Sequence, residues 1–268
     1  MIATQEFEKV LQIKLCRYPE FIPAATVSSY LVDGLLIDSG PAHTAEELAE
    51  FLRDRKVKTV VNTHFHEDHV AANRFLQDRY GVEIFASALA VAKISKPAVL
   101  YPYQEEVWGY PIPSQVQPLG KVIRTENFTF EVIPTPGHDR DHVCLFESNQ
   151  RWLFSGDLYI GKRPVVCRPL DDQWQILEDL KTVRELKPRV LFPAPGNVLF
   201  DPGETLDKVI AHLKSLGRQI EELHNTGLTI EAIRQKVFGE ENPSAPRTQN
   251  QFSSEKMVKS FLRWKVET

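Results

Sequence analysis

The chain has 268 residues, of which 42% are hydrophobic and 25% are charged, a composition typical of globular proteins. Its formal net charge of -4 argues against general binding to nucleic acid or to acidic membranes. No apolar run approaches the roughly 18 residues of a membrane-spanning helix, and the N-terminus has no signal-peptide pattern. The three cysteines are scattered, as reduced thiols are, so we expect a soluble, cytoplasmic protein.

Apolar segments in the first hundred residues predict short strands followed by helices. In chain order, we expect strands at 10–15, 27–32 and 35–37, a helix from about residue 45, a strand at 58–61, a helix at 69–80 and a strand at 82–86. Asp33-Gly34 predicts a hairpin turn, and Thr44 with Glu47 has the spacing of a capping box. Gly81 is expected to end the second helix.

The middle of the chain repeats this order of strands and helices. We expect strands at 128–133, 143–146 and 152–154, a helix at 173–186 and a buried strand at 190–192. Residues 97–113 carry four prolines and four aromatic side chains, which indicates a long loop or broken helix near a cleft. Its aromatics either line a substrate wall or pack on the core. Two sets of strands with helices after each predict an α/β protein with two sheets packed face to face.

From about residue 204 the pattern changes to helices alone. Amphipathic segments are expected at 204–223, 229–238 and 254–264, with a loop at Pro243 and Pro246 before the last one. We therefore divide the chain into a layered domain at 1–203 and a small helical appendage at 204–268. The basic residues 256–265 are interpreted as the solvated face of a docking helix rather than as a nucleic-acid reader.

The stretch VNTHFHEDH, residues 61–69, concentrates metal-binding side chains directly after a predicted strand. His64 and His66 lie two residues apart, and Asp68 and His69 follow at the start of the next helix. Imidazole and carboxylate groups suit zinc, iron or manganese. A surface loop with polar residues under a helix cap is the other interpretation, but four potential ligands in six residues favour a metal site.

This motif resembles the H-x-H-x-D-H signature of the metallo-β-lactamase-fold hydrolases, and two further segments follow in that family's order. PTPGHDRDH, residues 134–142, is similar to its Pro-Gly-His segment, and FSGDLYIG, residues 154–161, is similar to its Gly-Asp segment. The resemblance implies an αββα sandwich of two mixed sheets flanked by helices, with the metal site at one edge between the sheets. It also implies the metal ligands, which are His64, His66 and His138 for a first metal, Asp68 and His69 for a second, and Asp157 between the two.

The chain departs from the family pattern at one ligand of the second metal. The family usually has a histidine in a later Pro-Gly-His segment, whereas FPAPGNVLFD, residues 192–201, has Asn197 there. An amide oxygen is a weaker zinc ligand than imidazole. Asn197 either coordinates weakly or caps a turn. We therefore expect one tightly held zinc and a second that is weak, partly occupied or absent, with iron or manganese as alternative metals.

Other polar residues near these motifs have alternative roles. His142 is expected to support the site or the core rather than to bind metal. Arg163 and Arg168 follow the Gly-Asp segment, and they either pair with an anionic substrate group or form ordinary surface ion pairs. Cys144 and Cys167 are expected in the core or in a loop, and not as nucleophiles.

Together these features favour a metal-dependent hydrolase. A metal lowers the pKa of its bound water to about 7, and Asp68 is the candidate catalytic residue that orients the hydroxide or moves its proton. The resemblance is greatest to glyoxalase-II-type thioesterases and to the lactamase-like endoribonuclease. We expect a small-molecule ester, thioester or lactone as substrate, and no nucleic-acid or membrane partner. The alternatives are a mononuclear-iron persulfide dioxygenase, a single-stranded RNA endonuclease and a non-catalytic family member.

Overall fold

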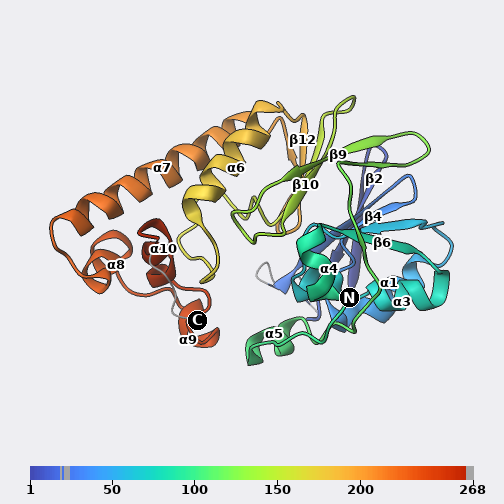
Figure 1. Cartoon of the computed structure of the whole chain (residues 1–268), viewed down its shortest axis with the longest axis horizontal. Helices are drawn as coiled ribbons and strands as arrows, with labels where there is room; N and C mark the ends of the chain where they lie inside the picture. The colour runs from blue at the N-terminus through green and yellow to red at the C-terminus, as the bar shows by residue number, and fades with distance from the viewer. Residues whose placement is uncertain (19, 21–24, 264–268) are drawn as a thin grey trace.

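The computed structural model describes residues 1–18, 20 and 25–263, and it contains two mixed β-sheets packed face to face (Figure 1). The first sheet has the order β1-β2-β3-β4-β5-β6-β7, with β1 (Ile2–Phe7), β2 (Val10–Leu15), β3 (Val27–Val32), β4 (Leu35–Ile37), β5 (Thr59–Val61), β6 (Glu83–Ala86) and β7 (Gln117–Pro118). The second has the order β13-β12-β11-β10-β9-β8, with β8 (Val122–Arg124), β9 (Thr129–Pro134), β10 (Val143–Glu147), β11 (Trp152–Gly156), β12 (Val190–Pro193) and β13 (Leu199–Phe200). The predicted α/β class with two mixed sheets is confirmed.

Helices cover the outer side of each sheet. On the first sheet, α1 (Ala45–Leu52) and α3 (Asn73–Tyr80) share a buried apolar cluster with strand residues such as Leu36. On the second, α6 (Gln173–Glu185) and α7 (Gly203–Asn225) share another cluster with strand residues such as Leu153. The layers therefore run helix, sheet, sheet, helix, the αββα sandwich that the family resemblance implied. The described residues also form η2 (Ala42–Thr44), α2 (Glu67–Val70), α4 (Ala88–Ile94), α5 (Pro102–Val107), α8 (Ile230–Phe238), α9 (Ser244–Arg247) and α10 (Ser254–Phe261).

The space between the sheets is filled by large aromatic side chains. Phe154 and Phe192 stack with their ring centroids 4.8 Å apart, and Tyr30 packs edge-on against both rings. The Tyr30 hydroxyl donates a 2.6 Å hydrogen bond to the carbonyl of Pro193, which joins β3 of one sheet to β12 of the other. A fully buried side chain of this size contributes about 1.5–3 kcal/mol of hydrophobic free energy. This core fixes the two sheets relative to each other.

Two local predictions for the first half of the chain are wrong. The helix predicted at 69–80 is interrupted between α2 and α3. The carbonyl of His69 accepts hydrogen bonds from the Ser39 N–H at 2.7 Å and from the Asn62 side chain at 3.1 Å, so it is engaged outside the helix. The predicted capping box at α1 also fails, because the Thr44 hydroxyl donates to the carbonyl of Pro41 and caps no helical N–H.

Several short elements escaped the sequence patterns. The strand β1 lies at a sheet edge and is only partly buried, so its residues do not show a clear apolar alternation. The segment at 97–113, predicted as a loop or broken helix, contains the single short helix α5. The helices predicted at 173–186, 204–223 and 229–238 are confirmed as α6, α7 and α8 with small shifts at their ends.

The C-terminal helices α8 and α10 pack against α6 and α7, the helices that cover the second sheet. Phe261 of α10 is buried in the cluster that also contains Leu153 of β11 and Leu180 of α6. The Trp174 indole N–H donates to the carbonyl of Phe261 at 2.9 Å, and the two rings meet edge to face. The helix predicted at 254–264 is confirmed as α10 for Ser254–Phe261. Residue 264, at its predicted end, and residue 265, at the end of the basic stretch, lie outside the described residues. The boundary after residue 203 stays a prediction, and a shared apolar cluster spans it.

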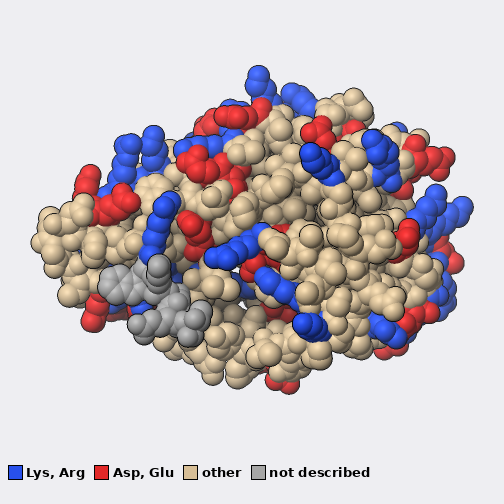
Figure 2. All heavy atoms as spheres, in the orientation of Figure 1, with Lys and Arg blue, Asp and Glu red and all other residues tan. Residues whose placement is uncertain are grey.

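Charges of both signs are interspersed over the face drawn in Figure 2, where several Lys and Arg side chains border a hollow near the centre. None of the helices within residues 1–18, 20 and 25–263 combines the length and the apolar character needed to span a membrane.

We expect Phe261→Ala to lower the free energy of unfolding by about 3–5 kcal/mol, since it leaves a cavity in the shared cluster. Urea unfolding followed by tryptophan fluorescence and by far-ultraviolet circular dichroism measures this change. Both signals should shift together, because one cluster joins the appendage to the sheet. Leu89→Ala is the control, since the Leu89 side chain is 62% exposed and its loss should change stability by less than about 0.5 kcal/mol. Two separate transitions, with only one affected by Phe261→Ala, would contradict this interpretation.

Candidate metal centre

The candidate ligands are brought together by strand ends that meet at one edge of the sandwich. β4 and β5 are parallel neighbours, so Asp38 after β4 and His64 after β5 lie at the same edge of the first sheet. His138 lies in the loop between β9 and β10 of the second sheet, and Asp157 directly follows β11. The N–H of Val143 donates to the carbonyl of Thr63 at 2.9 Å, which ties this loop region to the histidine motif.

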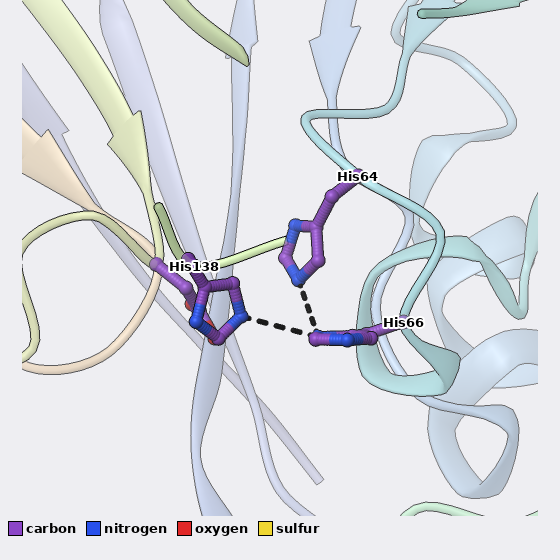
Figure 3. Close-up of side chains that lie close together, drawn as sticks. His64, His66 and His138 are labelled. Atoms are coloured by element: carbon purple, nitrogen blue, oxygen red, sulfur yellow. Dashed lines mark hydrogen bonds and ion pairs between the residues drawn. The ribbon is translucent and has the colours of Figure 1, made fainter. Parts of the chain in front are cut away.

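The structure brings together three buried histidines that the family resemblance implied as ligands of a first metal (Figure 3). The Nδ1 atom of His66 lies 2.8 Å from Nε2 of His64 and 3.2 Å from Nε2 of His138. These side chains and Asp157 each offer one ligand atom, and the four atoms lie within 4.8 Å of one another. Bonds of about 2.0–2.1 Å to one tetrahedral zinc would separate the ligand nitrogens by roughly 3.3 Å. The spacing therefore fits a single metal ion.

The second nitrogen of each ring has its own polar neighbour. The pairs are His64 Nδ1 with the Thr63 hydroxyl at 3.0 Å, His66 Nε2 with an Asp139 oxygen at 3.7 Å, and His138 Nδ1 with an Asp171 oxygen at 3.3 Å. Partners of this kind orient a metal-binding histidine and fix which nitrogen stays free. The opposite nitrogens of the three rings are the ones that converge, and that of His66 also contacts Nη1 of Arg168 at 2.8 Å.

A second group of candidate ligands lies beside the first. One oxygen of Asp157 is 3.5 Å from Nε2 of His138, and the other is 3.4 Å from Nε2 of His69. The carboxylate therefore lies between a first group, His64, His66 and His138, and a second group, Asp68 and His69. An oxygen of Asp68 lies 3.7 Å from the same nitrogen of His69. Asp68 Oδ1 and His69 Nε2 are buried without a hydrogen-bond partner. Because unpartnered buried polar atoms are unfavourable, their arrangement fits a cation between Asp68, His69 and Asp157.

Asp38 organises both groups, although it lies outside the motifs that the sequence offers. Its carboxylate accepts hydrogen bonds from the Thr63 N–H at 2.8 Å, from the Thr63 hydroxyl at 2.9 Å and from Nδ1 of His69 at 2.8 Å. Its backbone has φ of 58°, a conformation that few residues other than glycine, asparagine and aspartate adopt readily. The feature of the sequence that could have pointed to Asp38 is its position directly after the apolar strand in LLIDSG, residues 35–40.

His142 supports Asp157, as the sequence analysis expected. Its Nδ1 contacts the Thr135 hydroxyl at 2.7 Å, and its Nε2 accepts the backbone N–H of Asp157 at 3.1 Å, so both ring nitrogens are engaged. The neighbouring Gly156 has φ of 47°, and a Cβ there would lie only 2.6 Å from Nε2 of His142. Glycine is therefore required where the chain turns to present Asp157.

Asn197 lies apart from these contacts. Its side chain is exposed, and its Oδ1 accepts a hydrogen bond from Nζ of Lys14 at 3.4 Å. A role for Asn197 as a weak ligand stays a prediction. The amide oxygen has a cationic partner here, which makes it less available to a metal.

The two groups differ in how firmly they hold protons. Burial lowers the pKa of His64 and His66 well below the ordinary value, so these rings are neutral and ready to bind metal. For His69, burial acts in the same direction, but Asp38, Asp68 and Asp157 outweigh it and raise its pKa well above the ordinary value. Burial raises the pKa of Asp68 to about 6. His138 of the first group differs from His64 and His66, because Asp171 and Asp157 outweigh burial and raise its pKa above the ordinary value. A metal at the second group must displace the proton of His69, whose pKa is raised well above the ordinary value.

A cleft of about 730 Å³ opens onto the first group, and His66 and His138 lie on its wall. Part of the remaining wall comes from the segment between α4 and α5, including Val99, Leu100 and Tyr101. Both alternatives for the aromatic segment hold in part, because Tyr101 and Tyr103 line the cleft whereas Trp108 is buried. Arg168 also lines the cleft, whereas Arg163 is exposed and is not part of its lining.

Comparisons with known proteins show the family and the fold of this chain. The model of the metallo-beta-lactamase superfamily matches residues 22–194. The chain is 26% identical over 226 residues to the beta-lactamase-like protein 2 homolog of Drosophila melanogaster, covering 81% of this chain and 74% of that one. It is 27% identical over 191 residues to the atrochrysone carboxyl ACP thioesterase of Aspergillus fumigatus, covering 69% of this chain and 54% of that one. The crystal structure of a metallo-beta-lactamase family protein from Thermus thermophilus has the same fold, with a TM-score of 0.70 at 19% identity over 96% of this chain and 94% of that one.

We expect Asp38→Asn to weaken metal binding about 10- to 100-fold, the usual effect of losing a residue that orients a ligand. Asparagine tolerates the same backbone conformation, but its NH₂ group cannot accept from the donors of Thr63 and His69. Zinc affinity is measured by competition with a chromophoric chelator. Asp54→Asn is the matched control, because Asp54 is exposed and remote from the site. Equal affinities for Asp38→Asn and the control would show that Asp38 does not orient the ligands.

We further expect metal-stripped protein to bind one zinc tightly and a second more weakly. Lowering the pH should weaken the second step more, because the pKa of His69 is raised and its proton competes with the metal. Asn197→His should strengthen the second step, whereas Asn225→His, at an exposed position, should not. Titration calorimetry at several pH values measures both steps. Two ions bound equally tightly by the unaltered chain would contradict this expectation.

Proposed function

Because the chain belongs to the metallo-beta-lactamase superfamily, we propose that it is a zinc-dependent hydrolase that cleaves a thioester or related ester of a small molecule. The observation that carries the proposal is the convergence of His64, His66 and His138 with Asp157 at the wall of a substrate-sized cleft. Three imidazoles and one carboxylate are a donor set that suits zinc.

Zinc supplies a hydroxide nucleophile at neutral pH, because it lowers the pKa of its bound water to about 7. The chain's own contribution is a base beside that position. Asp68 is buried next to Asp157 and His69, and its Oδ1 has no partner among the described residues. Burial raises its pKa to about 6, so the carboxylate is an effective proton acceptor near neutral pH. We assign Asp68 the role of orienting the attacking water and accepting its proton.

The cysteines support hydrolysis without a covalent intermediate. Cys16, Cys144 and Cys167 are all buried and free. Burial raises the pKa of Cys144 to about 12 and raises that of Cys167 well above the ordinary thiol value. Because the thiolate is the reactive form, neither of these two thiols is an activated nucleophile.

The cleft supports a thioester or ester with an apolar portion. Val99 and Leu170 lie on its wall with side chains 98% and 73% exposed, so both have apolar surface available to a substrate. A thioesterase is also among the relatives of this chain. A lactone remains within the same reaction class, because its carbonyl is attacked in the same way.

We expect zinc-loaded protein to hydrolyse S-acyl-N-acetylcysteamine thioesters, with the released thiol detected by a colorimetric disulfide reagent. His66→Ala should lower kcat/KM roughly 1,000-fold, since a metal supplies several kcal/mol of transition-state stabilisation. His212→Ala is the matched control, because His212 lies on α7, where it contacts the carbonyl of Pro164. For the unaltered enzyme, kcat/KM should fall as the pH drops below about 6, where Asp68 becomes protonated.

The competing activities have distinct signatures. If iron-loaded protein consumes oxygen with a persulfide and hydrolyses no thioester, the protein is a persulfide dioxygenase and not a hydrolase. Cleavage of single-stranded RNA as the only hydrolytic activity would replace the proposal with a nuclease. A protein that stays metal-free after supplementation with zinc, iron and manganese would be a non-catalytic member of the family.

A further inference from the structure

Arg168 lies in the cleft directly beside the candidate ligands. Its Nη1 is 2.8 Å from Nδ1 of His66, and it shares the cleft wall with His66 and His138. Its guanidinium carbon lies 4.9 Å from the ring centroid of Phe252 and 6.0 Å from that of Trp108. Guanidinium groups bind favourably over aromatic faces, so these rings hold the side chain in the cleft.

Arg168 forms no direct ion pair among the described residues, although burial, which lowers its pKa, is outweighed by the nearby carboxylates of Glu67, Asp68 and Asp171. Within residues 1–18, 20 and 25–263, no Asp or Glu oxygen comes within ion-pair distance of this guanidinium. Its Nε is buried without a hydrogen-bond partner. Asp171 of the same loop accepts a hydrogen bond from the backbone N–H of Arg168 at 2.9 Å, and its other oxygen faces His138. A guanidinium has five N–H donors and is always charged, so this one needs an acceptor.

The contact with His66 does not remain available when the site is loaded. Nδ1 of His66 is the nitrogen that converges with Nε2 of His64 and of His138. A metal there takes the lone pair of Nδ1, and Nη1 of Arg168 then loses the acceptor that it has in this structure. The donors of Arg168 therefore face the place where a substrate meets the metal, and an anion satisfies them.

The C-terminal appendage positions Arg168. Phe252 precedes α10, and Gln251 and Lys256 from the same region line the cleft. Ser253 forms a β-bridge with Cys167, the residue before Arg168. The Ser260 hydroxyl donates to the carbonyl of Asp171 at 2.5 Å. The appendage thus contacts the loop that carries Arg168 on both sides of this residue, at Cys167 before it and at Asp171 after it.

Two further cations, Lys96 and Lys256, line the same cleft, again without a paired carboxylate among the described residues. Lys93 differs, because its Nζ is paired with Asp139 at 3.0 Å. Figure 2 shows basic side chains beside the central hollow. A cleft with an apolar wall and unpaired cations matches a molecule that has an apolar part and an anionic part.

We propose that Arg168, held by Phe252 and Trp108, binds a carboxylate or phosphate of the substrate, so that the preferred substrates are anionic thioesters. This proposal rests on the hydrolase function proposed above. Arg168 is then the residue that determines specificity, and Phe252 is a positioning residue supplied by the appendage.

The test compares three benzoyl thioesters on zinc-loaded protein, namely those of N-acetylcysteamine, 3-mercaptopropionate and 4′-phosphopantetheine. The first is neutral, the second carries a carboxylate and the third a phosphate, so the arms distinguish the two sources of negative charge. Arg168→Gln should lower the ratio of kcat/KM between an anionic and the neutral thioester about 10- to 100-fold, the usual effect of a hydrogen bond to a charged group. Arg163→Gln, at an exposed position in the same loop, should leave that ratio unchanged. Phe252→Ala should raise KM for the anionic thioester and leave kcat within about threefold, because it loosens Arg168 without removing it.

Binding of the corresponding non-hydrolysable thioethers, measured by calorimetry, separates this proposal from the proposed function. The anionic thioether should bind the unaltered protein more tightly than the neutral one, and Arg168→Gln should remove most of that difference even if no thioester is hydrolysed. If Arg168→Gln does not fold, the binding of the two thioethers to the unaltered protein still tests the proposal. Equal affinities for the neutral and the anionic thioether would overturn it. Cleavage of single-stranded RNA that depends on Arg168, without any preference for anionic thioethers, would overturn it as well.

Discussion

Asp38 accepts three hydrogen bonds from the chain that follows β5, and the geometry of the candidate site depends on them. They turn Nε2 of His69 toward Asp157 and hold Thr63 against the ring of His64. Leaving one such buried donor without an acceptor costs about 1–3 kcal/mol. The bonds form only because β4 and β5 are parallel neighbours, which brings Asp38 and Thr63 to the same edge. The geometry of the site therefore depends on the order of the strands in the first sheet.

A protein core usually satisfies its buried polar groups, and this edge of the sandwich does not satisfy all of its own. Asp68 Oδ1, His69 Nε2 and Nε of Arg168 are buried without partners. Under the proposals above, a cation would satisfy the first two and an anion beside it would satisfy the third. Binding of a metal and an anionic substrate would satisfy both kinds of group, and would stabilise the folded chain by mass action. The unsatisfied groups thus identify what the cleft is built to hold.

The sequence predicted the layered fold and brought out the histidine motif, because short-range patterns encode strands, helices and clustered ligands. It did not identify Asp38, since a carboxylate after a strand acquires its role only when the neighbouring strand is placed beside it. Arg163 and Arg168 were indistinguishable for a similar reason. Only the folded chain brings Phe252, which is far away in the sequence, over one guanidinium and leaves the other exposed. The break between α2 and α3 likewise depends on hydrogen bonds to Ser39 and Asn62, which lie outside the helix.

The most direct test of this account is the coordination of the tightly bound metal, measured by zinc-edge X-ray absorption and by anomalous diffraction from crystals of loaded protein. The account predicts one zinc with three imidazole nitrogens at about 2.0–2.1 Å, from His64, His66 and His138, together with a carboxylate oxygen of Asp157. A zinc bound mainly by oxygen ligands, or one located away from the edge where the two sheets meet, would contradict it.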